Sequence, residues 1–310
     1  MIDFIVIGAQ KAGTTWLYHR FRESSEINTL PIKEVHYFDR HSKYESNDKL
    51  AVEHLSKRLR SYSWVKNTLR KILWKRQYSN WKEFRWVLRW YFGAYNDAWY
   101  LSLFNGLNGV KGEITPAYSM LDVQDIKRMY AVAPQAKLIM ILRDPIDRAW
   151  SHFRFNTRKK GRNKVHDATT EEMMTFLDTP FQQERNAYRE TLQRYASIFP
   201  ADQILVGFYD AIQEEPSVFL GTICSFLGVQ NSASNNLSLK SRSNKSVEWD
   251  IPEVVYEKLL AMYEQEIKGL SDLFGGYASQ WRQRHYSEDG FTASHPKCAI
   301  RLSTVAHRLQ

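Results

Sequence analysis

The amino-terminal stretch FIVIGAQKAGTTWLYHRF constrains the fold of this chain more than any other segment. Residues 4–7 are all apolar, as in a strand buried on both faces of a parallel sheet. A loop with two glycines follows over residues 8–15, and residues 14–22 have the apolar spacing of an amphipathic helix. A strand, a glycine loop and a helix in this order begin a βαβ unit, so the sequence predicts an α/β fold.

The rest of the chain alternates between strand-like and helical segments. Strand-like runs predict further strands at residues 110–114, 136–142 and 203–209. Helices are expected after Pro145, which stands at a favoured first-turn position, and over residues 184–198, 216–227 and 252–270. We therefore expect a P-loop-like central parallel sheet flanked by helices, in one domain over residues 1–286 with a polar tail over 287–310.

One segment interrupts this alternation. Residues 56–92 contain eleven Lys and Arg, five Trp and a single acid, Glu83. The spacing of the aromatic residues predicts one or two amphipathic helices, within an insertion of about residues 44–96. Two interpretations remain open: a helical hairpin packed on the domain, or a platform for an acceptor or a membrane surface.

The overall charge and the two cysteines limit the class of partner and the compartment. A formal net charge of +9 favours anionic ligands. Cys224 and Cys298 are too few for a disulfide framework, so we expect a reducing, cytoplasmic location. The sequence has no apolar run long enough for a membrane span, and its start does not have the pattern of a signal peptide.

The loop GAQKAGTT resembles a nucleotide-triphosphate loop with its lysine displaced. In the pattern G-x-x-x-x-G-K-[ST] the lysine follows the second glycine, whereas here Lys11 precedes Gly13. Glycines, backbone N–H groups and a helix amino terminus still favour a bound phosphate. Asp144, after the strand 136–142, is a candidate Mg²⁺ ligand, so a small-metabolite kinase that uses ATP and Mg²⁺ is the alternative function.

Three motifs in order carry a family resemblance: QKAGTTWLYHRF, KEVHYFDR and LRDPIDRAWSHFR. Together they resemble the sulfotransferases that use 3′-phosphoadenosine 5′-phosphosulfate (PAPS), most closely the heparan sulfate sulfotransferase-type domains and related bacterial enzymes. The resemblance runs from about residue 5 to about residue 281, apart from the insertion. It implies sulfuryl transfer from PAPS to a hydroxyl or amine of a carbohydrate or small molecule, with adenosine 3′,5′-bisphosphate as product and no metal.

The resemblance also implies which residues bind the donor. Lys11 would contact the phosphosulfate near the oxygen that is released, and Arg143 and Ser151 would hold the 3′-phosphate. A surface salt bridge from Arg143 to Asp147 is the alternative. The other donor residues would lie in the loop, at the next helix start or in a late basic loop with a looser match; they are Gln10, Ala12, Gly13, Thr14, Thr15, Trp16, Tyr188, Asn244, Lys245 and Ser246.

Sulfuryl transfer to a hydroxyl requires a base close to the sulfur. The resemblance assigns this role to Glu34. In a strand-like segment Glu34 and His36 would point to the same side, so His36 could orient the acceptor. Lys33 is a lesser candidate for charge stabilisation. The alternative is that Glu34 merely pairs with Lys33 and that His36 is a packed ring.

Two further observations concern the acceptor. Glu113 is a candidate acceptor residue, either ordering the base or orienting the acceptor. Ile114 stands where the heparan-type enzymes have a second lysine, which argues against a strictly heparan-like acceptor. A basic protein that binds nucleic acid or an anionic glycan is a third hypothesis, but no nucleic-acid motif supports it, so nucleic acid is not an expected partner.

Overall fold

A computed structural model describes residues 1–45, 50–74, 81–159, 161, 168–229, 250–286 and 296–309. Its centre is a six-stranded sheet in the order β2-β3-β1-β4-β5-β6. All neighbouring strands are parallel except β6, which is antiparallel to β5. The strands are β1 (Phe4–Gly8), β2 (Ile27–Thr29), β3 (Val110–Ile114), β4 (Lys137–Leu142), β5 (Ile204–Phe208) and β6 (Ala299–Arg301). The expected α/β fold with a mainly parallel central sheet is confirmed.

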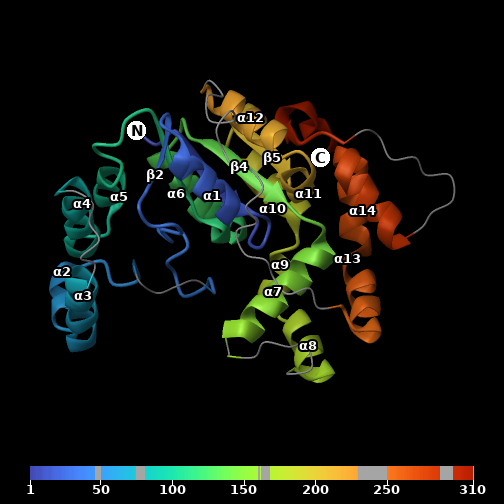
Figure 1. The fold of residues 1–310 in the computed structure, drawn as a ribbon, viewed down its shortest axis with the longest axis horizontal. Helices are drawn as coiled ribbons and strands as arrows, with labels where there is room; N and C mark the ends of the chain where they lie inside the picture. Colours follow the sequence, from blue (N-terminus) through green and yellow to red (C-terminus); the bar gives the residue numbers. More distant parts are fainter. Residues whose placement is uncertain are drawn as a thin grey trace.

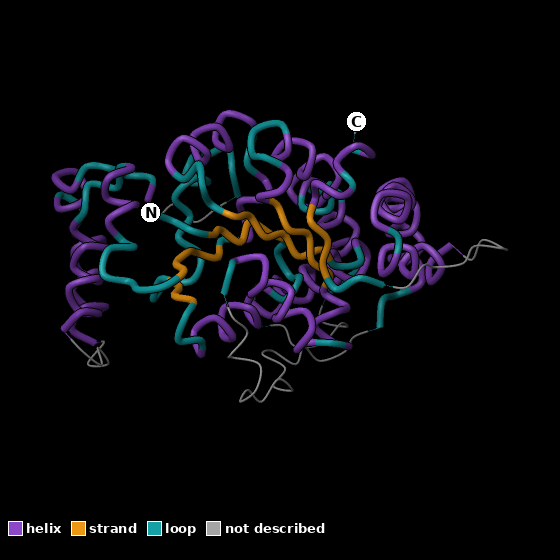
Figure 2. Tube along the Cα trace, turned by 90° about the horizontal axis from the view of Figure 1, so that it is seen from above, coloured by secondary structure: helices purple, strands orange, loops and turns teal. Residues whose placement is uncertain are grey.

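Helices cover both faces of this sheet, as the view from above shows (Figure 2). The helices outside the insertion are α1 (Thr14–Glu23), α6 (Val123–Val132), α7 (Pro145–Lys159), α8 (Thr170–Leu177), α9 (Pro180–Glu184), α10 (Tyr188–Ala196), α11 (Tyr209–Glu214), α12 (Pro216–Leu227), α13 (Glu253–Phe274) and α14 (Gly276–Tyr286). The core lies between these layers, and all five residues of β1 and of β5 are buried. Burial on both faces explains why these strands are continuous apolar runs.

Three details differ from the sequence-based expectation. The helix expected over 184–198 is shorter, since α9 ends at Glu184 and α10 begins only at Tyr188; between them the Asn186 side chain bonds Arg148 and the Pro145 carbonyl. β2 was not expected, since three residues are too short for a periodic signal. β6 belongs to the segment expected as a polar tail, yet its pairing with β5 makes it part of the sheet.

The insertion forms a separate group of helices beside the sheet, at the left of Figure 1. It contains α2 (Leu55–Leu59), α3 (Tyr62–Trp74) and α4 (Trp81–Phe92), followed by α5 (Asp97–Ser102). Trp86 and Trp90 on α4 are buried, and the Trp86 indole donates to the Leu103 carbonyl at 2.9 Å. None of the helices described is long and apolar enough to cross a membrane.

The register of the sheet determines where a site can form. Gly8 of β1 lies opposite Met140 of β4, and Val6 lies opposite Ile114 of β3. Because these strands are parallel, their carboxyl ends lie at one edge of the sheet. The glycine loop, the segment after Ile114 and the segment after Leu142 therefore all start at that edge.

Candidate active site

The glycine loop is held over the end of β4. The Ala9 N–H donates to the Ile141 carbonyl at 2.8 Å, and Gly13 precedes α1 with a φ of 86°. A Cβ on Gly13 would lie 2.6 Å from Cδ1 of Ile212, so both the space and the backbone conformation require glycine. The loop can therefore turn directly into α1 and present the free N–H groups of its first turn to an anion.

Lys11 lies within this loop and is surrounded by cations. Its Nζ lies 4.1 Å from the centre of the Phe155 ring on α7. Burial, and then the positive charges of Arg143, Lys33, Arg154 and Arg158, lower the pKa of Lys11 to about 8. The same positive charges that disfavour the ammonium form of Lys11 favour the binding of an anion.

Arg143 follows β4 and joins it to the loop. Its Nη1 donates to the Lys11 carbonyl at 3.0 Å, and its guanidinium lies 4.5 Å from the centre of the Tyr209 ring. Its buried Nε has no hydrogen-bond partner within the described residues. The alternative salt bridge to Asp147 is not present, since Asp147 pairs with Arg284 at 3.4 Å. The side chain of Arg143 thus retains donors for an anion at the loop.

Other residues expected at the donor site divide into three groups. Ser151 is buried on α7, two turns after Arg143, and Tyr188 is buried at the start of α10. The ring of Trp16 lies in the core, 6.2 Å from that of Phe219, and its backbone belongs to the first turn of α1. Ala12 is likewise fully buried. Asn244, Lys245 and Ser246 lie outside the described residues.

The segment with Glu34 and His36 lies against the end of β3. It is not strand-like as expected, since Glu34 and His36 both have left-handed backbone angles, with φ of 65° and 57°. The Glu34 N–H donates to the Ile114 carbonyl at 3.0 Å, and the Val35 N–H donates to the Thr115 hydroxyl at 2.9 Å. These bonds to β3 hold the segment in a conformation that its side chains alone would not favour.

The Glu34 carboxylate nevertheless lies between two cationic side chains. Lys33 Nζ is 2.6 Å from Glu34 Oε1, and His36 Nε2 is 3.7 Å from Glu34 Oε2. The other ring nitrogen of His36 lies 2.7 Å from Oδ2 of Asp39, a wholly buried carboxylate. Asp39 was not expected at the site, although it closes the KEVHYFD motif three residues after His36.

These contacts fix the charges of the group. Burial would raise the pKa of Glu34, but the hydrogen bonds from His36 and Lys33 lower it to about 2. Burial would lower the pKa of His36, but Asp39 and Glu34 raise it to about 9. At neutral pH Glu34 is therefore a carboxylate and His36 an imidazolium.

Of the two roles expected for Glu113, its burial argues against orienting the acceptor. It is only 1% exposed and cannot contact an acceptor. Its carboxyl accepts hydrogen bonds from Tyr100, from Thr115 at 2.7 Å and from Tyr118 at 3.1 Å, and burial raises its pKa to about 7. The Thr115 hydroxyl also accepts a hydrogen bond from the Val35 N–H, so Glu113 stabilises the segment of Glu34 through Thr115. Ile114 is buried as well, in place of the second family lysine.

Comparison with known proteins decides the family. A family model described as "Sulfotransferase domain" matches residues 1–258, most of the 310-residue chain. The chain belongs to the sulfotransferase domain family. Among curated relatives it is similar to carbohydrate sulfotransferase 15 of Mus musculus, with 27% identity over 194 residues, 56% of this chain and 30% of that protein. This sulfotransferase domain spans less than a third of the length of the curated relatives that it matches.

Solved structures share the fold of this sulfotransferase domain. One is a sulfotransferase from Alicyclobacillus acidocaldarius, with a TM-score of 0.59 and 20% identity over 88% of this chain and 95% of that one. Another is mouse sulfotransferase SULT7A1, complexed with PAP, with a TM-score of 0.50 and 13% identity over 93% of this chain and 89% of that one. At these identities the likeness shows the fold.

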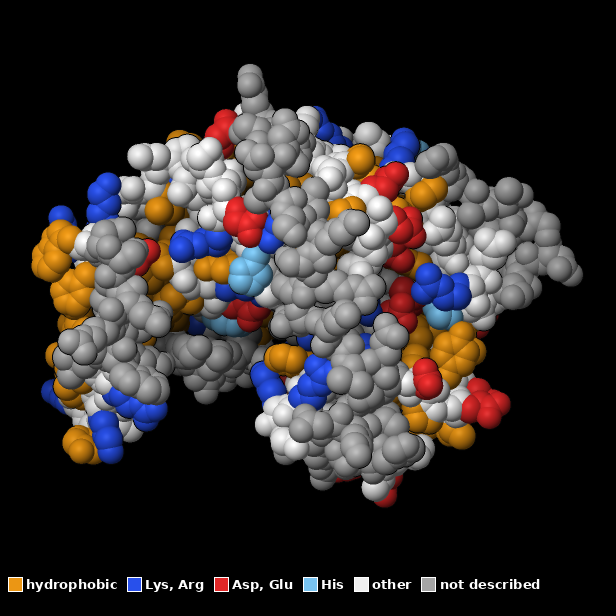
Figure 3. Space-filling model, viewed as in Figure 1, with side chains coloured by type: hydrophobic (Ala, Val, Ile, Leu, Met, Phe, Trp, Pro, Cys, Tyr) orange, Lys and Arg blue, Asp and Glu red, His pale blue; other side chains and the backbone are white. Residues whose placement is uncertain are grey.

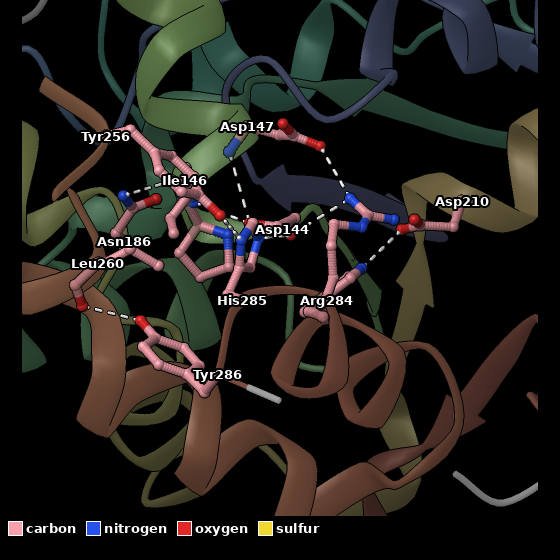
Figure 4. A network of polar contacts seen from close by, with 12 residues as sticks. Asp144, Ile146, Asp147, Asn186, Asp210, Tyr256, Leu260, Arg284, His285 and Tyr286 are labelled. Carbon is pink, nitrogen blue, oxygen red and sulfur yellow. Dashed lines mark hydrogen bonds and ion pairs between the residues drawn. The ribbon is translucent and has the colours of Figure 1, made fainter. Parts of the chain in front are cut away.

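The kinase alternative loses its main structural support in this sulfotransferase domain. Asp144, its candidate Mg²⁺ ligand, is 1% exposed. One carboxylate oxygen accepts from the Ile146 N–H at 2.9 Å, and the other lies 2.6 Å from His285 Nε2 and 3.5 Å from Arg284 (Figure 4). Asp144 therefore caps α7 and pairs with α14, and its oxygens are already bonded within the protein.

Proposed function

We propose that this chain transfers a sulfuryl group from PAPS to a hydroxyl or amine of a carbohydrate or small-molecule acceptor, with Glu34 as general base. One observation carries the proposal. Lys33 lies close enough to Lys11 to lower its pKa, and it also contacts Glu34 at 2.6 Å. The anion-binding loop and the candidate base are thus neighbours, as an in-line transfer requires.

The described residues fit such a donor. The cations around Lys11, the Gly13 turn and the buried, unpartnered Nε of Arg143 suit a ligand with more than one anionic group. We assign the 5′-side phosphate to the loop and the first turn of α1, and the 3′-phosphate to Arg143 and Ser151. When bound, PAPS supplies a sulfuryl group whose leaving group is adenosine 3′,5′-bisphosphate.

Lys11 and Lys33 then have complementary tasks. Lys11 stabilises negative charge at the leaving oxygen, which requires its ammonium form. An anion on the loop attracts Lys33, and departure of Lys33 from Glu34 raises the pKa of that carboxyl. Glu34 then becomes a stronger base for the acceptor proton, while His36 keeps the carboxylate oriented.

The acceptor would approach from the side of the insertion. Tyr37 follows His36 directly; its hydroxyl donates to Asp97 at 2.5 Å, and its ring stacks on Tyr100 at 4.4 Å. The helix α5, which follows the insertion directly, therefore adjoins the base segment. A carbohydrate acceptor is supported by the name of the mouse relative, and the buried Ile114 argues against strict heparan-type chemistry.

The outer side of the insertion supports a membrane-surface role. Tyr62 and Trp81 are 79% and 68% exposed, and Leu59 and Leu69 are about half exposed. Hydrophobic and basic side chains lie together on these protruding helices (Figure 3). Exposed aromatic rings beside Lys and Arg suit the surface of an anionic bilayer.

The free, buried thiols of Cys224 and Cys298 support the reducing cytoplasm as the location.

Labelled-sulfate transfer tests the proposal. The protein is incubated with PAPS and a panel of oligosaccharides, lipids and phenols, without added metal, and the products are analysed by mass spectrometry. We expect sulfated product from at least one class. Phosphorylated product that requires ATP and Mg²⁺ would instead establish the kinase, and failure to bind either nucleotide would refute both enzymes. Co-sedimentation with vesicles of neutral or anionic lipid tests the membrane surface separately.

A further inference from the structure

A chain of three polar side chains, two of them buried, joins the carboxyl-terminal helices to the residue beside Arg143. Tyr256 on α13 places its hydroxyl 2.8 Å from Nδ1 of His285 on α14. The distance between Nε2 of His285 and Oδ2 of Asp144 is 2.6 Å. The side chains of His285 and Asp144 are 4% and 1% exposed, and Figure 4 draws the three side chains together. No step of the proposed transfer uses Tyr256 or His285.

Asp144 is held from both of its carboxylate oxygens. Oδ1 accepts the backbone N–H of Ile146 at 2.9 Å and caps the amino terminus of α7, while Oδ2 faces His285. The Asp144 carbonyl also accepts the Arg148 N–H at 2.8 Å. Both the backbone and the carboxylate of Asp144 are therefore fixed, and so is the backbone from which Arg143 extends.

The charge of Asp144 makes this arrangement relevant to binding. A carboxylate adjacent in sequence to an arginine competes with any anion for that guanidinium. His285 and Arg284 direct Oδ2 of Asp144 towards α14 instead. The guanidinium of Arg143 therefore contacts the Lys11 carbonyl and the Tyr209 ring and does not pair with Asp144.

We propose that His285, oriented by Tyr256, is a positioning residue for the 3′-phosphate of the donor. It acts through Asp144 on Arg143, and it does not touch the nucleotide. This inference rests on the proposed function, because it assumes that Arg143 binds the 3′-phosphate. Donor recognition then depends on the packing of α14, a helix distant in sequence from Arg143 and Ser151.

The test compares two nucleotides that differ only in the 3′-phosphate, adenosine 3′,5′-bisphosphate and adenosine 5′-monophosphate, by calorimetry on the full chain. In His285→Ala the dissociation constant of the bisphosphate should rise about tenfold, the size expected for a lost hydrogen bond to a charged group. That of the monophosphate should change less than about twofold. His285→Gln retains an N–H donor at a similar distance and should recover much of the loss.

Tyr286→Phe is the matched control. It removes a 2.8 Å hydrogen bond between α14 and the Leu260 carbonyl of α13, also drawn in Figure 4, and does not touch Asp144. It should leave the ratio of the two affinities unchanged. Equal weakening of both nucleotides in His285→Ala, or no weakening, would overturn the inference. If His285→Ala does not fold, Tyr256→Phe must shift the ratio by itself. Wild-type protein that binds neither nucleotide would refute the proposed function itself.

Discussion

The imidazole of His36 bonds the buried carboxylate of Asp39, with 2.7 Å between Nδ1 and Oδ2. The opposite ring nitrogen lies 3.7 Å from the Glu34 carboxylate. Asp39 thus favours the charged form of His36, and charged His36 favours the ionised form of Glu34. The buried Asp39 therefore affects the charge of the more exposed Glu34 through His36.

Asp39→Asn should therefore change two pKa values in opposite directions. The pKa of His36 should fall from about 9, and that of Glu34 should rise from about 2. Titration of labelled side chains by NMR measures both. Because the folded-state pKa of His36 is raised above 6.5, the stability it provides is complete below pH 6.5 and is lost as pH rises through 9. The stability advantage of wild type should therefore decrease over that window, and a difference independent of pH would contradict the coupling.

Glu34→Gln should abolish turnover without abolishing donor binding. Glutamine keeps the shape of the side chain but cannot accept the acceptor proton, so kcat should fall at least about a hundredfold. Adenosine 3′,5′-bisphosphate should bind within about threefold of wild type, because the phosphates contact other residues. Glu23→Gln is a suitable control, since Glu23 pairs with Arg20 on α1, outside the site. Retention of more than a tenth of the rate would remove Glu34 as the base.

Lys11→Arg should remove a pH dependence of nucleotide binding. Burial and the neighbouring cations lower the pKa of Lys11 to about 8, so this lysine loses its charge above that pH in the free protein. The dissociation constant of wild type for adenosine 3′,5′-bisphosphate should then rise by up to about tenfold per pH unit above pH 8. Arginine stays charged, so the variant should bind with nearly constant affinity from pH 7 to 9.5. An equal slope in both proteins would show that another group titrates.

The sequence predicts those parts of the fold that have a local signal. The strands β1, β4 and β5 are largely apolar runs, β3 is followed by Thr115 and Pro116, and Gly13 marks a turn that favours glycine. β2 and β6 have three residues each, and hydrophobic periodicity cannot be recognised at that length. Their existence depends on neighbouring strands that are distant in sequence.

The site was predicted less completely than the fold, for a similar reason. Lys11, Glu34 and Arg143 belong to motifs, but burial depends on tertiary packing, which a motif does not report. Glu113 was therefore expected near the acceptor, although it lies in the core. His285 is 141 residues from Asp144, so no local pattern joins them. The left-handed backbone at Glu34 and His36 likewise results from bonds to β3, and the segment was expected to be extended.

Glu113→Gln should make the protein relatively more stable at alkaline pH. Burial raises the pKa of Glu113 from 4.5 to about 7, so the unfolded chain releases this proton before the folded chain does. Wild-type stability therefore falls between pH 4.5 and 7, by up to about 3 kcal/mol, whereas glutamine does not titrate. Urea unfolding at pH 5 and pH 8 measures the difference, with the exposed Glu190→Gln as control. If Glu113→Gln were equally destabilising at both pH values, the buried carboxyl would have an ordinary pKa and would already be ionised at pH 5.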